Sequence, residues 1–278
     1  MTKTIDAHHH LWHYTAADYG WIGDNMRSLR RDFLVADLEA ELRAAKIDGA
    51  VAVQASQTVE ETEWLLGLAN RHDFMCGVVG WAPFASAKFA PVLEALREHK
   101  KLKGLRHVIQ DEPDDAFILR EDFNAGIDRM QGTGLVYDIL IFERHLPNAI
   151  RFVDRHPNQT FVLDHIAKPR IADGLIEPWA TNLRELARRE NVSCKLSGMV
   201  TEADWTLWNV ETLRPYADTA LEAFGADRIM MGSDWPVCLL AVSYTQWMRT
   251  VDALVSQLTP GEQESVLGGT AMRVYDLA

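Results

Sequence analysis

Three consecutive histidines, His8, His9 and His10, stand near the start of the chain in an apolar stretch that runs from Ile5 to Trp12. Side chains alternate between the two faces of a β-strand, so we expect Asp6, His8 and His10 on one face and His9 on the other. Two imidazoles about 7 Å apart on one strand can converge on a single ligand, water or carbonyl oxygen. A purification tag would be longer and would not be embedded in an apolar strand. The pair therefore predicts the floor of an active site, with satisfied core histidines as the alternative.

Polar side chains also mark the ends of later apolar segments. These positions are Arg106 and His107, Tyr137 and Asp138, Asp164 and His165 with Lys168 beyond, Lys195 and Ser197, and Ser233 and Asp234. Burying polar groups without partners is costly, so packing alone does not explain their clustering at one end of the strands. Several alternatives stay open: Asp234 is also a candidate turn or N-cap residue, and Lys195 a candidate interior ion-pair partner. Tyr137 and Asp138 are neighbours, so only one of them can face inward.

The elements that must position these residues are short apolar segments alternating with amphipathic helical patterns. The predicted strands are Ile5–Trp12, Ala50–Ala55, Met75–Trp81, Leu102–Ile109, Leu135–Phe142, Thr160–Ile166, Val192–Ser197 and Arg228–Ser233. The predicted helices are Val35–Ala45, Glu60–His72, Lys88–His99, Arg120–Met130, Asn148–His156, Trp179–Arg189, Thr212–Phe224 and Tyr244–Leu258.

Eight strand–helix units with near-continuously apolar strands predict a closed, parallel (β/α)8 TIM barrel, in which catalytic groups gather at the C-terminal strand ends. A doubly wound open sheet is the runner-up, but no Gly-x-Gly-x-x-Gly turn follows any strand. We expect residues 1–278 to form one domain. Thr259 and Thr270 are predicted N-caps of short C-terminal helices, and Pro260 suits a first helical turn.

The composition of the chain limits the kinds of molecule that the protein is expected to bind. The formal net charge of −12 over 278 residues argues against nucleic-acid or anionic-membrane binding. The three cysteines, Cys76, Cys194 and Cys238, are widely spaced and form neither a disulfide framework nor a Cys-x-x-Cys pair. We expect no signal peptide, because the start of the sequence lacks a basic segment followed by a hydrophobic stretch, and no uninterrupted apolar segment approaches about 20 residues. We therefore expect a soluble cytoplasmic protein that acts on a small molecule, with no indication of its oligomeric state.

Aromatic residues fall in or near the predicted strand-end loops, namely Trp12, Tyr19, Trp21, Trp81, Trp205, Trp208 and Trp235. An indole offers a flat apolar face and one N–H donor, which suits a partly apolar ring that carries hydroxyls. We expect Trp12 and Trp235 in particular to contact a sugar-derived substrate.

Four motifs in this order resemble the amidohydrolase superfamily, and within it the sugar-lactone and pyrone-dicarboxylate lactonase branch. The motifs are Asp6-Ala7-His8-His9-His10, Lys103-Gly104-Leu105-Arg106-His107, Leu163-Asp164-His165-Ile166-Ala167-Lys168-Pro169 and Gly232-Ser233-Asp234-Trp235-Pro236. The resemblance spans nearly the whole chain. It implies a (β/α)8 barrel and hydrolysis of a lactone, with lactones of sugar acids such as fuconate and rhamnonate as the nearest substrates.

The resemblance implies roles for these residues. Asp234 is expected to act as general base on water, while His8, His10 and His165 polarise the lactone carbonyl. Arg106 is expected to bind a substrate hydroxyl or carboxylate, with Tyr137 and Lys168 as weaker candidates. One divalent ion such as Zn²⁺ fits on His8, His10, Asp234 and His165 if a metal is bound, but members that work without metal leave its requirement open.

Three alternatives are carried forward. A metal-dependent decarboxylase uses the same scaffold, but it normally needs a metal-binding His in the fifth strand. The predicted fifth strand, Leu135–Phe142, contains no His. A pyrone-dicarboxylate lactonase shares the branch. A non-catalytic sugar-binding barrel would suit the tryptophan-rich rim, but it has no reason to keep an aspartate opposite three histidines.

Overall fold

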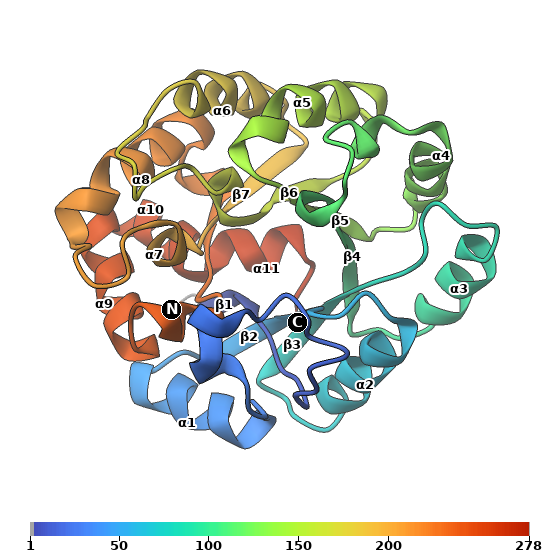
Figure 1. Cartoon of the computed structure of the whole chain (residues 1–278), viewed down its shortest axis with the longest axis horizontal. Coiled ribbons are helices and arrows are strands. Elements are labelled where there is room, and N and C mark those ends of the chain that lie inside the picture. The colour runs from blue at the N-terminus through green and yellow to red at the C-terminus, as the bar shows by residue number, and fades with distance from the viewer. Residues whose placement is uncertain (1–2, 278) are drawn as a thin grey trace.

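Eight parallel strands surrounded by helices form the centre of the computed structural model, which describes residues 3–277 (Figure 1). The strands are β1 (Ile5–His9), β2 (Gly49–Val53), β3 (Met75–Gly80), β4 (Leu102–Val108), β5 (Val136–Leu140), β6 (Phe161–Leu163), β7 (Val192–Leu196) and β8 (Ile229–Met231). Each strand pairs in parallel with the next. The N–H of Asp234 donates to the carbonyl oxygen of His8 at 2.8 Å, and the N–H of His10 donates to that of Trp235 at 2.6 Å. These bonds close the sheet, which confirms the predicted barrel.

Helices surround the strands, although α11 lies across the centre of the ring in this view and not on its outside (Figure 1). They are α1 (Val35–Ala45), α2 (Val59–Ala69), α3 (Phe89–Leu96), α4 (Glu121–Met130), α5 (Leu146–Arg155), α6 (Trp179–Ala187), α7 (Met199–Glu202), α8 (Val210–Phe224), α9 (Tyr244–Val255), α10 (Pro260–Glu264) and α11 (Thr270–Val274). Short turns of 3-10 helix join them, namely η1 (Asp24–Leu29), η2 (Ile109–Asp111), η3 (Phe117–Leu119), η4 (Glu143–His145), η6 (Ala226–Arg228) and η7 (Val237–Leu240). All eight predicted strands and all eight predicted helices are found within a few residues of their expected ends.

Of the two N-caps predicted for the short C-terminal helices, one is confirmed and one is wrong. Thr259 caps α10 with its side chain, and the Glu262 carboxylate accepts the Thr259 N–H at 2.8 Å in return. Thr270, by contrast, is not an N-cap, because the helical backbone runs on from α10 through the π-helical segment Ser265–Gly269 into α11. Its hydroxyl instead donates to the carbonyl oxygens of Ala226 and Asp227.

The interior of the barrel is apolar toward the N-terminal ends of the strands, and residues near the C-terminus of the chain close this end. Its members are Ile5, Ala7, Val51, Val53, Cys76, Val79, Val136, Val162, Met230, Ala271, Tyr275 and Leu277. Above this layer the inward positions turn polar, as expected at the end of a barrel that holds a site.

The alternation predicted for the first strand is broken by a register shift. Asp6 pairs with Ala50 and His9 with Ala52, so three steps of β1 oppose two steps of β2. Asp6 therefore does not share the face of His8 and His10. Its carboxylate accepts hydrogen bonds from Ser233 and from the Tyr244 hydroxyl of α9, outside the barrel.

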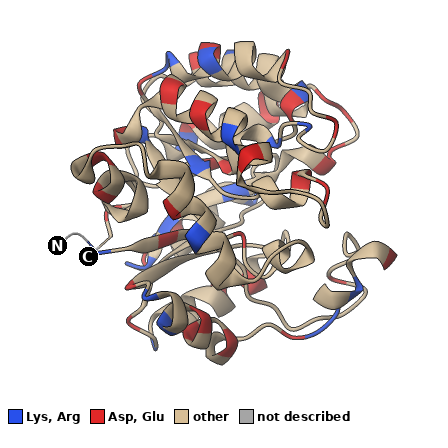
Figure 2. Cartoon of the chain, turned by 90° about the vertical axis from the view of Figure 1, so that its left-hand side faces the viewer, with Lys and Arg blue, Asp and Glu red and all other residues tan. Residues whose placement is uncertain are grey.

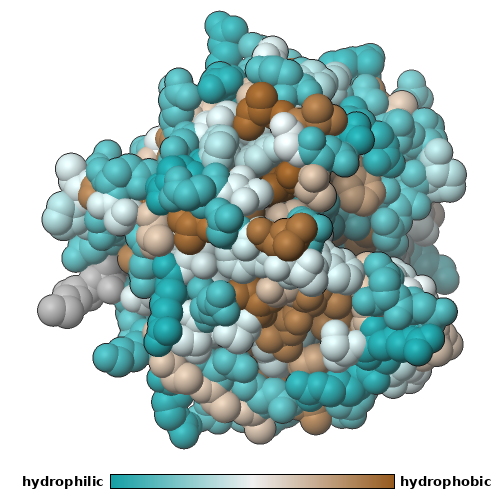
Figure 3. Space-filling view, turned by 60° about the vertical axis from the view of Figure 1, so that its left-hand side comes forward, coloured by the Kyte–Doolittle hydropathy of each residue, from teal (hydrophilic) through white to brown (hydrophobic). Residues whose placement is uncertain are grey.

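Figures 2 and 3 show how charged and apolar residues are distributed in two views of the molecule. Lys and Arg are interspersed with Asp and Glu over the helices visible in Figure 2. On the face in Figure 3, hydrophilic residues cover most of the surface and apolar ones gather around a hollow. No helix among residues 3–277 is long and apolar enough to span a membrane.

Candidate active site

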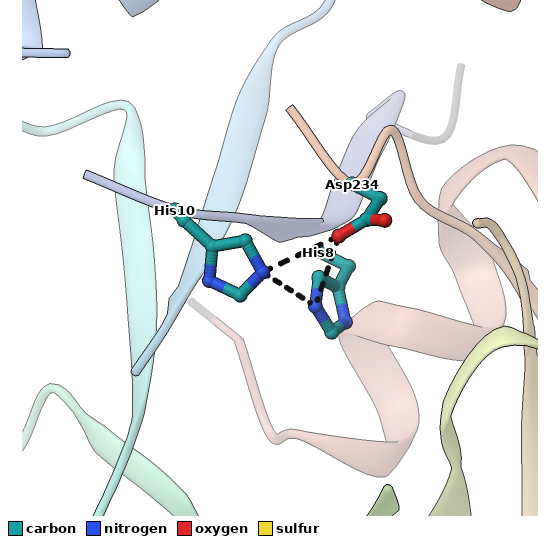
Figure 4. Close-up of side chains that lie close together, drawn as sticks. All are labelled: His8, His10 and Asp234. Atoms are coloured by element: carbon teal, nitrogen blue, oxygen red, sulfur yellow. Dashed lines mark hydrogen bonds and ion pairs between the residues drawn. The ribbon is translucent and has the colours of Figure 1, made fainter. Parts of the chain in front are cut away.

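Two imidazoles and a carboxylate converge where the first strand meets the end of the last (Figure 4). The Nε2 atoms of His8 and His10 are 3.2 Å apart, and Oδ1 of Asp234 lies 3.3 Å from His10 Nε2 and 3.8 Å from His8 Nε2. All three side chains are almost fully buried. The backbone of Asp234 has a φ of 55°, a left-handed conformation that is costly for an aspartate and turns its carboxylate back over the barrel.

The hydrogen bonds of His10 fix its ring. Nδ1 of His10 lies 2.8 Å from the carbonyl oxygen of Val53, which can only accept, so Nδ1 carries the proton and Nε2 presents a lone pair. That lone pair is 3.3 Å from Asp234 Oδ1, which is also an acceptor. Two acceptors at this distance require a proton or a cation between them.

His8 can carry its proton on either nitrogen. Its Nδ1 lies 3.2 Å from the Lys195 ammonium, a donor, and 3.3 Å from Asp164 Oδ1, an acceptor. With the proton on Nε2 the ring donates into the site, and with the proton on Nδ1 it offers a second lone pair. The nitrogens of His8 and His10 and a carboxylate oxygen of Asp234 lie within 4.8 Å of one another, so these residues could hold one metal ion.

His165 reaches the same place through an unusual turn. Residues His165, Ile166, Ala167 and Lys168 all have positive φ, between 48° and 61°. In a continued strand Asp164 and His165 would point to opposite faces, but this left-handed turn brings both toward the site. His165 Nε2 lies 3.8 Å from Asp234 Oδ1, and its Nδ1 is 2.8 Å from the Ser197 hydroxyl. The Trp179 indole donates to the carbonyl oxygen of Ile166 at 2.7 Å and anchors the turn.

A buried ion network lies beneath the imidazoles. The Lys195 ammonium contacts Asp138 Oδ2 at 2.5 Å and Asp164 Oδ1 at 2.9 Å, and all three side chains have no exposure to solvent. The Tyr275 hydroxyl donates to the Asp138 carboxylate at 2.8 Å from the closed end of the barrel. Lys195 is therefore an interior ion-pair partner, and Asp138, not Tyr137, is the inward residue of β5.

Arg106 faces the site, but the protein occupies its donors. Its guanidinium donates from Nε and Nη2 to Gln54 Oε1, from Nη2 to the Gln54 carbonyl oxygen at 2.5 Å, and from Nη1 to Asp164 Oδ2 at 2.8 Å. Nη1 also lies 3.4 Å from His8 Nε2. An arginine has five N–H donors, so little of this fork is left for a bidentate ligand contact.

His10, His165 and Asp234 line a cavity of about 650 Å³, a size typical of small-molecule sites. Its polar lining includes His10, Arg106, His165, Lys168, Glu202 and Asp234, and its apolar lining includes Trp21, Met26, Phe142, Trp205, Val237 and Leu240. Lys168 thus lies where a substrate contact was predicted, and Trp21 and Trp205 supply the aromatic wall.

Three predicted substrate contacts are wrong. The side chain of Tyr137 points out of the barrel and is fully buried there, with its ring packed among Phe84, Phe123, Phe152 and Phe161. Trp12 and Trp235 are also buried, and both pack edge-on against Phe33, the former with its indole donating to the carbonyl oxygen of Arg31. On β5 the inward position is taken by Asp138, which binds Lys195, so Tyr137 points outward.

Burial keeps the imidazoles of His8 and His165 neutral. It lowers the pKa of His8 well below its usual value, and it lowers the pKa of His165 to about 4, although Asp234 and Asp164 oppose this shift. Burial also opposes ionisation of Asp234, but His165, the His10 contact and Lys168 outweigh it, and the net pKa of Asp234 lies below its usual value. At neutral pH the site therefore presents the ionised carboxylate of Asp234 beside the neutral imidazoles of His8 and His165.

Two cavity-associated residues were missed in the sequence. Gln54, which holds Arg106, follows the apolar strand β2, and the criterion of a polar residue at a strand end would have found it. Glu202 lies at the end of α7 and lines the cavity. It falls outside the helices and strands predicted from the sequence, so no pattern indicated that it would reach the site.

Comparisons with known proteins agree with this geometry. A model of the amidohydrolase family matches residues 5–277. The L-fucono-1,5-lactonase of Burkholderia multivorans (strain ATCC 17616 / 249) is 42% identical over 98% of this chain and 96% of that protein. An L-fucono-1,5-lactonase of Burkholderia ambifaria is 37% identical over 99% of this chain and 96% of that protein. A crystal structure of an amidohydrolase from Burkholderia multivorans with bound zinc is similar with a TM-score of 0.96 and 43% identity, covering 99% of this chain and 100% of that chain.

Proposed function

The chain belongs to the amidohydrolase family, and we propose that it hydrolyses L-fucono-1,5-lactone or a closely related sugar-acid lactone. The observation that carries this proposal is the buried carboxylate of Asp234 within 4 Å of three imidazoles at the floor of an open cavity. The two full-length lactonase relatives support the substrate class.

The reaction follows from the ionisation states of the site. Ionised Asp234 accepts a proton from a water molecule, and the resulting hydroxide attacks the lactone carbonyl carbon. The Nε2 atoms of His8 and His165 face the same space and donate N–H bonds to the oxyanion of the tetrahedral intermediate when Lys195 and Ser197 donate to their Nδ1 atoms. Asp234 then returns the proton to the departing ring oxygen, which yields the open hydroxy acid.

The chain also has a donor set that fits one divalent ion. The facing acceptors of His10 and Asp234, together with His8, would hold it, and His165 lies beside them. A bound Zn²⁺ would polarise the carbonyl oxygen as a Lewis acid. We propose that the ion can bind but that hydrolysis does not depend on it, because a lactone is an activated ester and the protein supplies its own N–H donors.

The residues of β5 argue against the decarboxylase alternative. The inward residue of that strand is Asp138, which is committed to Lys195 and Tyr275 beneath the site. No imidazole on β5 is therefore available as the further metal ligand that such an enzyme needs.

A panel of aldonolactones with a pH indicator tests the proposal, since each opened ring releases a proton. We expect acidification well above the spontaneous rate, with L-fucono-1,5-lactone among the fastest substrates. Release of carbon dioxide from a conjugated acid, with no lactone opened faster than in the enzyme-free blank, would refute it. We further propose a cytoplasmic location, which the three unpaired, buried cysteines support.

A further inference from the structure

Lys168 and Glu202 face each other across the cavity wall without a direct hydrogen bond. Lys168 follows the left-handed turn after β6, and Glu202 ends α7. Lys168 Nζ lies 3.9 Å from Glu202 Oε1, which is beyond hydrogen-bonding distance. Among residues 3–277, no donor lies within hydrogen-bonding distance of the Glu202 carboxylate. The pair therefore keeps one charged donor and one charged acceptor available to a third group.

A hydroxyl group matches this gap, because it can accept from the ammonium and donate to the carboxylate at the same time. Both side chains are only slightly exposed, 16% for Lys168 and 23% for Glu202. Burial raises the pKa of Glu202, and the charge of nearby Asp234 raises it further, while Lys168 lowers it. Glu202 and Asp234 line the same cavity, so one small substrate can contact both carboxylates.

The charges of the cavity disfavour an anionic substrate. Four carboxylates line it, those of Asp18, Asp111, Glu202 and Asp234, but only two cationic side chains do. One of the cations, Arg106, is already paired with Asp164 at 2.8 Å. The other, Lys168, is balanced by Glu202. No cationic side chain is therefore left over to neutralise a substrate carboxylate.

We propose that Glu202 and Lys168 are specificity-determining residues that together bind one hydroxyl of an uncharged lactone and exclude lactones that carry a carboxylate. This inference rests on the proposed lactonase function. It separates the protein from an enzyme for a pyrone dicarboxylate, which would need a free cationic clamp.

The experiment compares three 1,5-lactones with the same ring configuration, in which C6 is a methyl, a hydroxymethyl or a carboxylate group. For the wild-type protein we expect kcat/KM to be similar for the first two and about 100-fold lower for the third. Glu202→Gln keeps the size of the side chain and removes its charge. It should raise KM for the neutral lactones about tenfold and reduce discrimination against the carboxylate about tenfold.

Lys168→Met should also raise KM for the neutral lactones, but it should increase discrimination against the carboxylate, because the cavity loses a cation. Glu211→Gln, at the exposed start of α8, is the control and should change neither quantity. Equal turnover of all three lactones by the wild type, or unchanged discrimination in both variants, would overturn the inference. Failure of the wild type to open any lactone would instead overturn the proposed function itself.

Discussion

The backbone N–H of Asp234 donates a 2.8 Å hydrogen bond to the carbonyl oxygen of His8. This bond joins the two edges of the sheet, so the last strand places the proposed base directly beside the imidazoles of the first. Because the contact is made by main-chain atoms, it does not depend on the side chain at position 234. Substitution of that side chain can therefore change the chemistry while the barrel stays closed.

Gly198 makes room for His165. It has a φ of 64°, and a Cβ atom at this position would lie 2.7 Å from the His165 ring. We expect Gly198→Ala to displace the ring and lower kcat by about 100-fold, as misplacements of about 1 Å do. Steady-state kinetics on the preferred lactone would measure this.

Gly134→Ala is the matched control for that variant. Gly134 has a φ of 80°, but nothing lies within 4 Å of its Cβ position. Both substitutions should lower stability by about 1–2 kcal/mol through the left-handed backbone, but only Gly198→Ala should lose activity. Equal activity of the two variants would contradict the positioning role of Gly198.

The buried network makes Lys195 important for stability. Lys195→Met leaves Asp138 and Asp164 without their shared cation, and we expect the free energy of unfolding to fall by about 3–5 kcal/mol. Adding Asp138→Asn should recover part of that loss, because one of the two buried negative charges is removed. Urea unfolding of both variants measures this, and a double variant less stable than the single one would contradict the account.

Glu61 should make stability depend on pH. Its carboxylate accepts N–H bonds from Ala55 at 2.9 Å and Ser56 at 2.8 Å, but burial raises its pKa from 4.5 to about 7. Between these values the folded state holds a proton that the unfolded state has released. The stability advantage of protonated Glu61 is therefore complete below about pH 4.5 and is lost as the pH rises through about 7.

The change amounts to at most about 3 kcal/mol. Glu61→Gln cannot titrate, so the difference in unfolding free energy between wild type and variant should drift in this direction from pH 5 to pH 8. Chemical denaturation at several pH values provides the measurement. A difference that stays constant would show that the folded pKa of Glu61 is not raised.

Metal binding should involve His10 directly. After incubation with Zn²⁺ and dialysis, we expect about one ion per chain in the wild type and far less in His10→Ala. His107→Ala is the control, because His107 is also buried but bonds Glu112 and stacks on Phe117 away from the site. Chelated wild-type protein should keep most of its lactonase activity. Complete loss on chelation, restored by zinc, would contradict the proposed independence from metal.

Periodicity was sufficient to predict the barrel. Each strand is a short apolar segment followed by a helical pattern, and α1 begins and ends at the predicted residues Val35 and Ala45. The same logic grouped His8, His10, His165 and Asp234, because parallel strand ends meet at one face of a barrel.

Features that break local rules could not be predicted this way. The register shift in β1 moved Asp6 outside the barrel, and the left-handed residues from His165 to Lys168 brought neighbouring side chains to one side. Asp138, and not Tyr137, points into the barrel because it binds Lys195 and Tyr275, which are distant in sequence. Such long-range partners leave no local signal, so Tyr137 could not be excluded as a substrate contact from the sequence.

The most direct test of the central claim is the kcat of Asp234→Asn on the preferred lactone. The substitution keeps the shape of the side chain and the backbone bond to His8 but removes the proton acceptor. We expect kcat to fall by at least about 1,000-fold with an unchanged melting temperature, while Asp111→Asn, which alters another carboxylate of the same cavity, should stay within about threefold of the wild type. Near-normal lactone opening by Asp234→Asn would contradict the account.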